Sequence, residues 1–327
     1  MRAIIAIAFD TLTLLCRRRL FWLNIWLSLA VVLVVASISC DRDGWSLGFG
    51  MKAWPSGYLT GGSTWETTLF FGVVRRALHW WVGGAAPLLA LFSMASVVPK
   101  TLKSGQAALL FTKARRRSEV LLGRFAGGLL FVAIPTVICV TGLYLTVGWR
   151  LGVWESRIFL AIPFALLLFA VLSAVTVMLG VLTKSSSASL VVTLIFAASV
   201  LALQYAAARP GEVEDEGEFK GMVRNASGGY IALQSVAWPL PRTHDLMEGM
   251  DRAIGLKSPH LFRDLVRRWG IGDLRVGAAA ASVLDANPDL PATPVTPLKL
   301  GEAIIVTTAF TCLTLGVAAF MLNRRDL

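Results

Sequence analysis

The hydrophobic positions of the chain lie in long uninterrupted blocks rather than in an alternating pattern. A helix needs about 20 consecutive apolar residues to cross the hydrocarbon core of a bilayer. Six stretches of that length contain no Asp, Glu, Lys or Arg: Leu20–Ser39, Ala77–Val98, Phe125–Gly148, Ile158–Thr183, Ala188–Ala208 and Ala303–Leu322. Only helices and closed barrels satisfy every backbone group in lipid, and a barrel shows short alternating strands instead. The pattern therefore predicts an all-α integral membrane protein with six transmembrane helices.

A shorter apolar pattern precedes the first of these helices. Apolar residues recur there at helical spacing, at Ile4, Ile5, Ala8, Phe9, Leu12 and Leu15. We expect residues 1–19 to form an interfacial amphipathic helix on the cytoplasmic membrane surface, with Arg17–Arg19 at its basic end; a frayed tail is the alternative. The apolar block that follows is longer than the roughly 7–15 residues of a signal peptide's apolar region, so we expect the first helix to be retained.

The net charge of +11 follows a membrane topology rather than one basic patch. Basic residues cluster before the first helix, in the connection between the second and third helices, and after the last helix: Arg2, Arg17–Arg19, Lys100, Lys103, Lys113, Arg115–Arg117, Arg124, Arg324 and Arg325. Short loops rich in Lys and Arg face the cytoplasm. Both termini are therefore expected to be cytoplasmic, and nucleic acid is not an expected partner.

Residues 209–300 form the sizeable polar stretch of the chain, and this topology puts them outside the cytoplasm, between the fifth and sixth helices. Ser258-Pro259 is a typical helix start, and Leu261, Phe262, Leu265 and Trp269 then share one helical face. Prolines recur at every third position from Pro288 to Pro297, the period of polyproline II. We expect a helix followed by an extended spacer; an extracytoplasmic protein partner is the alternative use of this region.

Composition argues against a cytosolic enzyme of ordinary composition, and the absence of clustered polar groups in the predicted helices disfavours a membrane-embedded enzyme. The chain is 56% hydrophobic and only 16% charged, and its four cysteines are isolated, without the spacing of a metal or redox site. The six predicted helices contain no carboxylate, and the chain has no GxxxxGK[ST] loop for ATP. We therefore expect no catalytic, metal or cofactor site in this chain, and any active transport must be powered by another polypeptide.

The connection at residues 99–124 carries the clearest functional pattern. Gln106–Lys113 reads as a short amphipathic helix with Leu109 and Leu110 on its face, followed by a basic turn. Such a helix on the cytoplasmic surface is a docking surface for a protein; an anchor to anionic lipid is the alternative. Gly123 and Gly127 have the spacing that lets two helices approach closely.

This connection resembles that of the ABC-2 type permeases, the membrane subunits of ABC transporters. Gly105, Leu109-Leu110, Thr112, Arg117 and Gly123-Arg124-Phe125 fall at the family's spacing. The ending Phe320 to Leu327, with its Arg-Arg-Asp-Leu, also resembles that of the family. The resemblance implies that an ATPase-coupling site is formed by Gly105, Leu109, Leu110, Thr112, Arg115, Arg116, Arg117, Glu119, Gly123 and Arg124.

The resemblance further implies a permease, and an exporter, that pairs with a second copy or a sister permease and binds cytoplasmic ATPase subunits, which would hold ATP and Mg²⁺. The expected organisation is a cytoplasmic interfacial helix (1–19), five transmembrane helices with the coupling loop 99–124 (20–208), an extracytoplasmic region (209–300), and a sixth helix with a cytoplasmic tail (301–327). We expect a multi-pass protein of the bacterial inner membrane, in contact with lipid. The alternative is a membrane scaffold or receptor whose 209–300 region binds a partner without transport.

Overall fold

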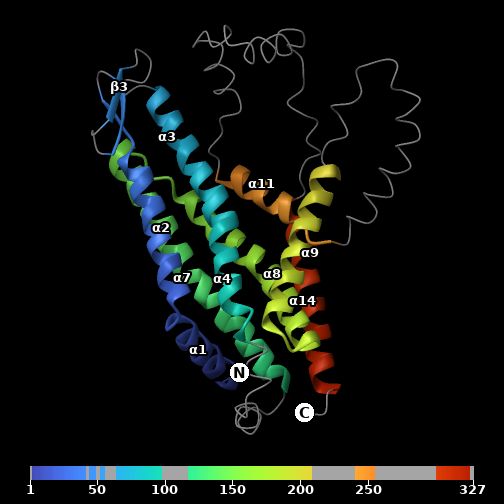
Figure 1. Cartoon of the computed structure of the whole chain (residues 1–327). Helices are drawn as coiled ribbons and strands as arrows, with labels where there is room; N and C mark the ends of the chain where they lie inside the picture. The colour runs from blue at the N-terminus through green and yellow to red at the C-terminus, as the bar shows by residue number, and fades with distance from the viewer. Residues whose placement is uncertain are drawn as a thin grey trace, which may run out of the picture.

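The computed structural model describes residues 2–41, 44–48, 52–55, 64–97, 117–207, 240–254 and 300–324. The described chain is predominantly helical, and six of its helical segments are long and apolar enough to cross a membrane: Arg19–Ser37, Phe70–Met94, Ser118–Leu151, Ser156–Thr183, Ser186–Gln204 and Leu300–Arg324. The prediction of a six-helix membrane protein is confirmed at this level. Figure 1 shows these helices standing side by side as one bundle.

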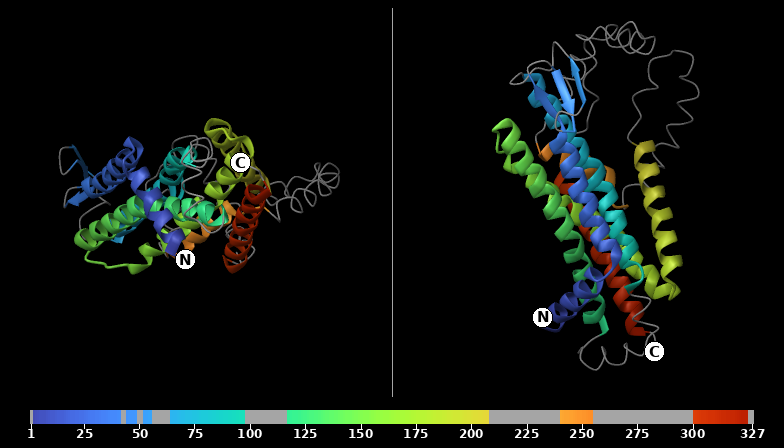
Figure 2. Two further views of the ribbon diagram at one scale, coloured as in Figure 1. Left: turned by 90° about the horizontal axis from the view of Figure 1, so that it is seen from below. Right: turned by 60° about the vertical axis from the view of Figure 1, so that its left-hand side comes forward.

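The helices in chain order are α1 (Arg2–Cys16), α2 (Arg19–Ser37), α3 (Thr64–Ala77), α4 (Ala86–Met94), α7 (Arg117–Leu151), α8 (Ala161–Thr183), α9 (Ser186–Ala207), α11 (Thr243–Ala253) and α14 (Leu300–Arg324). A π-helix, η1 (Leu78–Ala85), joins α3 to α4, and a 3₁₀ segment, η2 (Ser156–Leu160), leads into α8. α1 and the C-terminal end of α14 lie at the same end of the bundle, which we call the α1 end (Figures 1 and 2).

A small antiparallel sheet lies at the opposite end, which we call the sheet end. It comprises β1 (Ser39–Asp41), β2 (Gly44–Leu47) and β3 (Lys52–Pro55) in the order β1-β2-β3. The sequence pattern does not predict these strands, because strands this short carry too few residues for a visible alternation. The all-α description therefore holds for the membrane-spanning part but not for the segment that follows α2.

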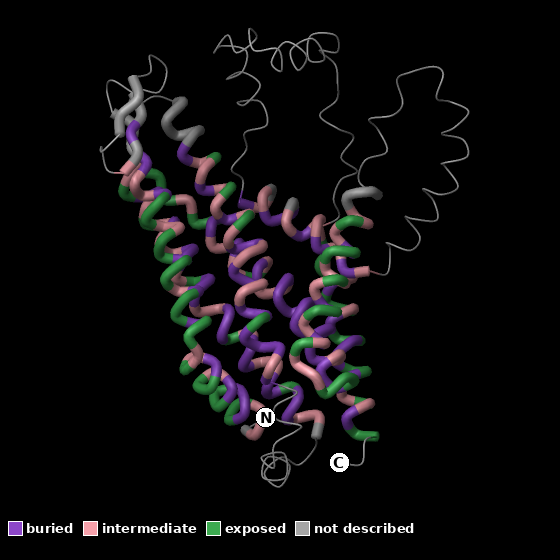
Figure 3. Tube along the Cα trace, in the orientation of Figure 1, coloured by how far each residue is buried: buried purple, intermediate pink, exposed green. Residues whose placement is uncertain are grey.

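α8 is the central helix and contacts α4, α7, α9, α14 and η1. Figure 3 shows buried positions in the middle of the bundle and exposed ones along the outer sides of α2 and α9. Most of the buried apolar side chains form two large clusters, one toward the α1 end that includes Phe131 and Phe169, and one toward the sheet end that includes Leu78 and Leu143; Ile7 and Val120 form a small third one. The outward apolar side chains have the character of a lipid-facing surface.

Exposed tryptophans mark both ends of the outer surface. Trp22 and Trp26 are exposed near the start of α2, and Trp80, Trp149 and Trp154 are exposed toward the sheet end. Tryptophan favours the boundary between lipid and water, where its ring and its N–H are both accommodated. These two groups support the placement of the bundle across a membrane.

Two helices begin earlier than the sequence pattern indicated. The second apolar helix includes Arg75 and Arg76 and begins at Thr64 rather than Ala77, and α7 begins at Arg117 rather than Phe125. The expected boundaries depended on the absence of charged residues, but Arg75 and Arg124 are paired with acidic side chains from other helices. The predicted loop 99–124 is shortened accordingly, since its last residues are helical.

A helix before the first transmembrane helix is confirmed as α1, so the alternative of a frayed tail is wrong; its position on the cytoplasmic membrane surface stays a prediction. The helix and spacer predicted around 258–297 lie outside the described residues. Within 209–300 the structure describes residues 240–254, and α11 in this stretch packs against η1, α8, α9 and α14. Part of the expected extracytoplasmic region therefore belongs to the bundle.

Candidate functional site

The predicted coupling residues divide into two groups. Arg117, Glu119, Gly123 and Arg124 lie in the first turns of α7. The others lie outside the described residues: Gly105, Leu109, Leu110, Thr112, Arg115 and Arg116. The described group can be analysed through its contacts with α1, which packs along this part of α7.

The glycines at the start of α7 let α1 approach closely. A Cβ added at Gly123 would lie 2.7 Å from Ile7 Cβ, and one at Gly127 would lie 2.5 Å from Thr11 Cβ and 2.7 Å from the carbonyl oxygen of Ala8. Neither position has room for a side chain. The close helix contact predicted for Gly123 and Gly127 is confirmed, and its partner is α1.

Arg124 adds an ion pair to the contact between α1 and α7. Its side chain is only 3% exposed, and its Nη1 lies 3.3 Å from Asp10 Oδ2 on α1. Arg124 also donates a hydrogen bond of 3.1 Å to Thr11 Oγ1, and Thr11 in turn donates to the carbonyl of Ile7. A buried charge is costly unless it is paired and hydrogen-bonded. Arg124 is therefore an internal contact between α1 and α7 rather than an exposed docking residue.

A second arginine ties the corner between α1 and α2 to the end of α4. Arg18 donates hydrogen bonds to the Ser93 carbonyl, at 2.7 Å, and to Ser96 Oγ. Burial lowers the pKa of the Arg18 guanidinium, because desolvation disfavours its charged form. The N-terminal segment thus contacts the chain on both sides of the connection 98–116. Arg18 binds the end of α4, and Asp10 pairs with Arg124 at the start of α7. We call this arrangement the N-terminal clamp (Arg18, Ser93, Asp10, Thr11 and Arg124).

A second polar group lies where α11 crosses the bundle (Figure 1). Gln204 at the end of α9 accepts hydrogen bonds at its Oε1 from the backbone N–H of His244, at 2.8 Å, and from Thr243 Oγ1, at 3.3 Å. Its Nε2 donates to the Pro241 carbonyl. The first N–H groups of a helix have no partner within it, so Gln204 caps α11 from another helix.

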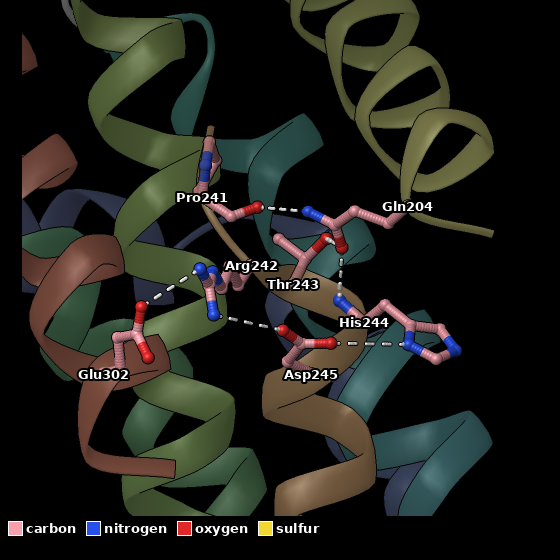
Figure 4. A network of polar contacts seen from close by, with 7 residues as sticks. All are labelled: Gln204, Pro241, Arg242, Thr243, His244, Asp245 and Glu302. Carbon is pink, nitrogen blue, oxygen red and sulfur yellow. Dashed lines mark hydrogen bonds and ion pairs between the residues drawn. The ribbon is translucent and has the colours of Figure 1, made fainter. Parts of the chain in front are cut away.

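Arg242 fixes the same end of α11 to α14. Its guanidinium lies 3.3 Å from Glu302 Oε1 on α14 and 3.9 Å from Asp245 Oδ2 on α11, and His244 Nδ1 lies 3.8 Å from Asp245 Oδ1 (Figure 4). The side chains of Arg242, Asp245 and Glu302 are each partly buried. The N-terminal end of α11 is therefore held to α9 and α14 by several polar contacts.

The other end of α11 meets α3 and the π-helix. Asp251 Oδ2 lies 3.3 Å from Arg75 Nη2 and 3.3 Å from His79 Nδ1. The six membrane helices predicted from the sequence contain no carboxylate of their own, but the fold brings Asp251 against one of them. Asp251 lies 176 positions after Arg75 in the chain, so no local pattern links it to Arg75 or His79.

The sequence did contain a signal for α11 itself. Leu246, Met250 and Ile254 are spaced four residues apart and are buried in the bundle. Half of the intervening residues are charged, and the apolar stripe is too short for a membrane helix, so a search for apolar blocks of membrane length does not find it. The residues that contact α11 cannot be predicted from this spacing, because they depend on how distant helices pack.

Within the described ranges, no group of three or more His, Cys, Asp or Glu side chains could hold a metal ion. The polar groups described above, the N-terminal clamp and the groups at the two ends of α11, consist of ion pairs and hydrogen bonds, most of them between helices. Comparison of the chain with protein-family models and with curated proteins found no match.

Proposed function

We propose that the chain is the permease subunit of an ATP-driven ABC-2 type transporter of the bacterial inner membrane, and that it works as an exporter. It would pair with a second copy or a sister permease and bind two cytoplasmic ATPase subunits, which hold ATP and Mg²⁺. Support comes from the resemblance at Gly105–Phe125, from six apolar helices, and from α1 and the end of α14 lying at one end of the bundle.

The observation that carries the proposal is the N-terminal clamp. Residues 98–116 connect α4 to α7, and Arg18 and Arg124 link the flanks of this connection to α1 and α2. A force on the connection would therefore act on α1, α2, α4 and α7 together. That is what a coupling element requires if ATPase closure is to move the helices between two arrangements.

The first experiment tests ATPase binding. The tagged chain is co-expressed with an ATPase encoded beside its gene and purified from membranes. Co-purification is expected with the unmodified chain and is expected to be lost in L109D/L110D, because two carboxylates would replace the two leucines of the predicted docking helix. The matched control is L284D/L290D, the same double change in the region expected on the other side of the membrane.

The outcomes separate the two candidate functions. If the double variant L109D/L110D still co-purifies with the ATPase, residues 109 and 110 do not form the docking surface. If the unmodified chain binds no ATPase, the permease proposal fails and a scaffold or receptor without transport becomes the better description. If binding is lost only in L109D/L110D, stimulation of the ATPase by candidate cargo in reconstituted membranes then identifies the substrate.

A further inference from the structure

α11 is attached to the bundle very differently at its two ends. Its N-terminal end is capped by Gln204, which makes three hydrogen bonds, and bridged by Arg242, which pairs with both Glu302 and Asp245. Its C-terminal end depends on Asp251, whose side chain is 10% exposed. Among the described residues, Asp251 Oδ1 is buried and accepts no hydrogen bond, and His79 Nδ1, although 3.3 Å from Asp251 Oδ2, makes none either.

This asymmetry makes the polar attachment of the C-terminal end the weaker of the two. Removing a carboxylate from water is costly, and the cost is recovered only when its oxygens are fully paired. Asp251 has one oxygen shared between Arg75 and His79, and Arg75 is itself 40% exposed, so water weakens that pair. The apolar contact at this end is made in part by methionine side chains, which are flexible and repack easily.

The surface that receives α11 is also irregular. The side chains of Met247 and Met250 lie over Gly83 of the π-helix, where an added Cβ would be 3.8 and 3.7 Å from their Cε atoms. The N–H of Ala86 bonds to the carbonyl of Trp81, five residues back, and Pro87 then offers no N–H at all. Short π-helical segments interrupt the regular hydrogen-bond ladder and are sites where a helix can change its direction.

We propose that α11 is a hinged strap across the sheet end of the bundle. It is pinned at its N-terminal end to α9 and α14, and it is released at Asp251 from Arg75 and His79. Release would uncover the apolar cluster that Met250 and Ile254 now cover, between α3 with η1 on one side and α8 on the other. This inference concerns movement within the chain and does not depend on the proposed transport function.

Hydrogen exchange followed by mass spectrometry on the full chain in lipid nanodiscs tests the strap. The decisive variant is Arg75→Gln, which leaves the Asp251 carboxylate buried with a weaker partner. We expect amides of Met250–Ile254 to exchange about fivefold faster, while amides of the central helix α8 are unchanged. Adding Asp251→Asn to Arg75→Gln is expected to restore at least half of the lost protection, because no unpaired charge then remains.

Two further variants provide the controls. Arg76→Gln makes the same change on an exposed neighbour of Arg75 and is expected to leave α11 at the wild-type exchange rate. Gln204→Leu removes the cap at the pinned end and is expected to speed exchange along the whole of α11. The strap is refuted if Arg75→Gln leaves Met250–Ile254 unchanged, if it speeds α8 by the same factor, or if Arg76→Gln has an equal effect.

Discussion

Removing Asp10 from its pair with Arg124 should weaken the docking of α1 on α7 far more than removing Arg124. Asp10→Asn leaves the Arg124 guanidinium at 3% exposure without its counter-charge. Breaking a fully buried pair in this way costs about 3–5 kcal/mol. Asp10 is 55% exposed, so water already screens much of the attraction, and Thr11 still accepts one hydrogen bond. We expect a cost of about 1–2 kcal/mol for docking α1 on α7.

The reverse substitution, Arg124→Met, should be milder. It leaves Asp10 half in water, where the carboxylate remains hydrated, and it fills the buried space with an apolar side chain of similar length. We expect a cost below about 1 kcal/mol, and we expect the double variant to be more stable than Asp10→Asn alone. The asymmetry follows from which partner is buried, not from the strength of the pair.

Hydrogen exchange of α1 amides in the full chain measures this docking directly, and about 1–2 kcal/mol corresponds to about 5–30-fold faster exchange in Asp10→Asn. Thr11→Val and Thr13→Val are the matched controls, since Thr11 accepts a hydrogen bond from Arg124 while Thr13 is exposed and bonds only within α1. The reasoning is refuted if Arg124→Met loosens α1 more than Asp10→Asn, or if both threonine variants behave alike.

Three further predictions concern the same end of the bundle. Gly127→Ala should destabilise the docking of α1 by about 1–3 kcal/mol in the same exchange measurement, because its Cβ would overlap Thr11; Gly316→Ala, which meets open space, should be neutral. Burial raises the pKa of the Cys16 thiol, so its thiolate fraction at pH 8 is reduced and alkylation by iodoacetamide should be slower than for a free thiol, with recovery when α1 is loosened by Asp10→Asn. Arg18→Met should lower the thermal stability of the chain by removing two hydrogen bonds to the end of α4, worth about 1–2 kcal/mol.

The membrane helices could be predicted because one physical constraint sets them. Hydrocarbon thickness fixes the length of each apolar block, and backbone satisfaction requires a helix. The ends of these helices could not be placed by the same rule. Arg75 and Arg124 read as loop residues in a pattern search, yet both lie within helices because Asp251 and Asp10 neutralise them.

The candidate sites were predictable only where the signal is local. The spacing of Gly123 and Gly127 indicated a close helix contact, and the structure supplies α1 as the partner. Gln204 carries no comparable signal, since an amide at the end of an apolar helix is unremarkable until α11 lies beside it. Contacts between distant segments depend on how the whole bundle packs. No short stretch of a single sequence shows which distant segments will lie side by side.

The N-terminal clamp and the strap meet on one continuous helix, and their relation can be tested. In α4, the carbonyl of Ser93 accepts a hydrogen bond from Arg18. Arg75 in α3 and His79 in η1 both contact the carboxylate of Asp251. α4 is packed against α2, α7 and α8, so it moves as part of the bundle, whereas α3 can change its angle at the π-helix. Loosening α1 alone should therefore not reach α11. We expect Asp10→Asn to speed exchange in α1 and to leave Met250–Ile254 unchanged in the isolated chain. Faster exchange at both sites would show that the helix transmits motion rigidly through η1, and a hinge at the π-helix would then be wrong.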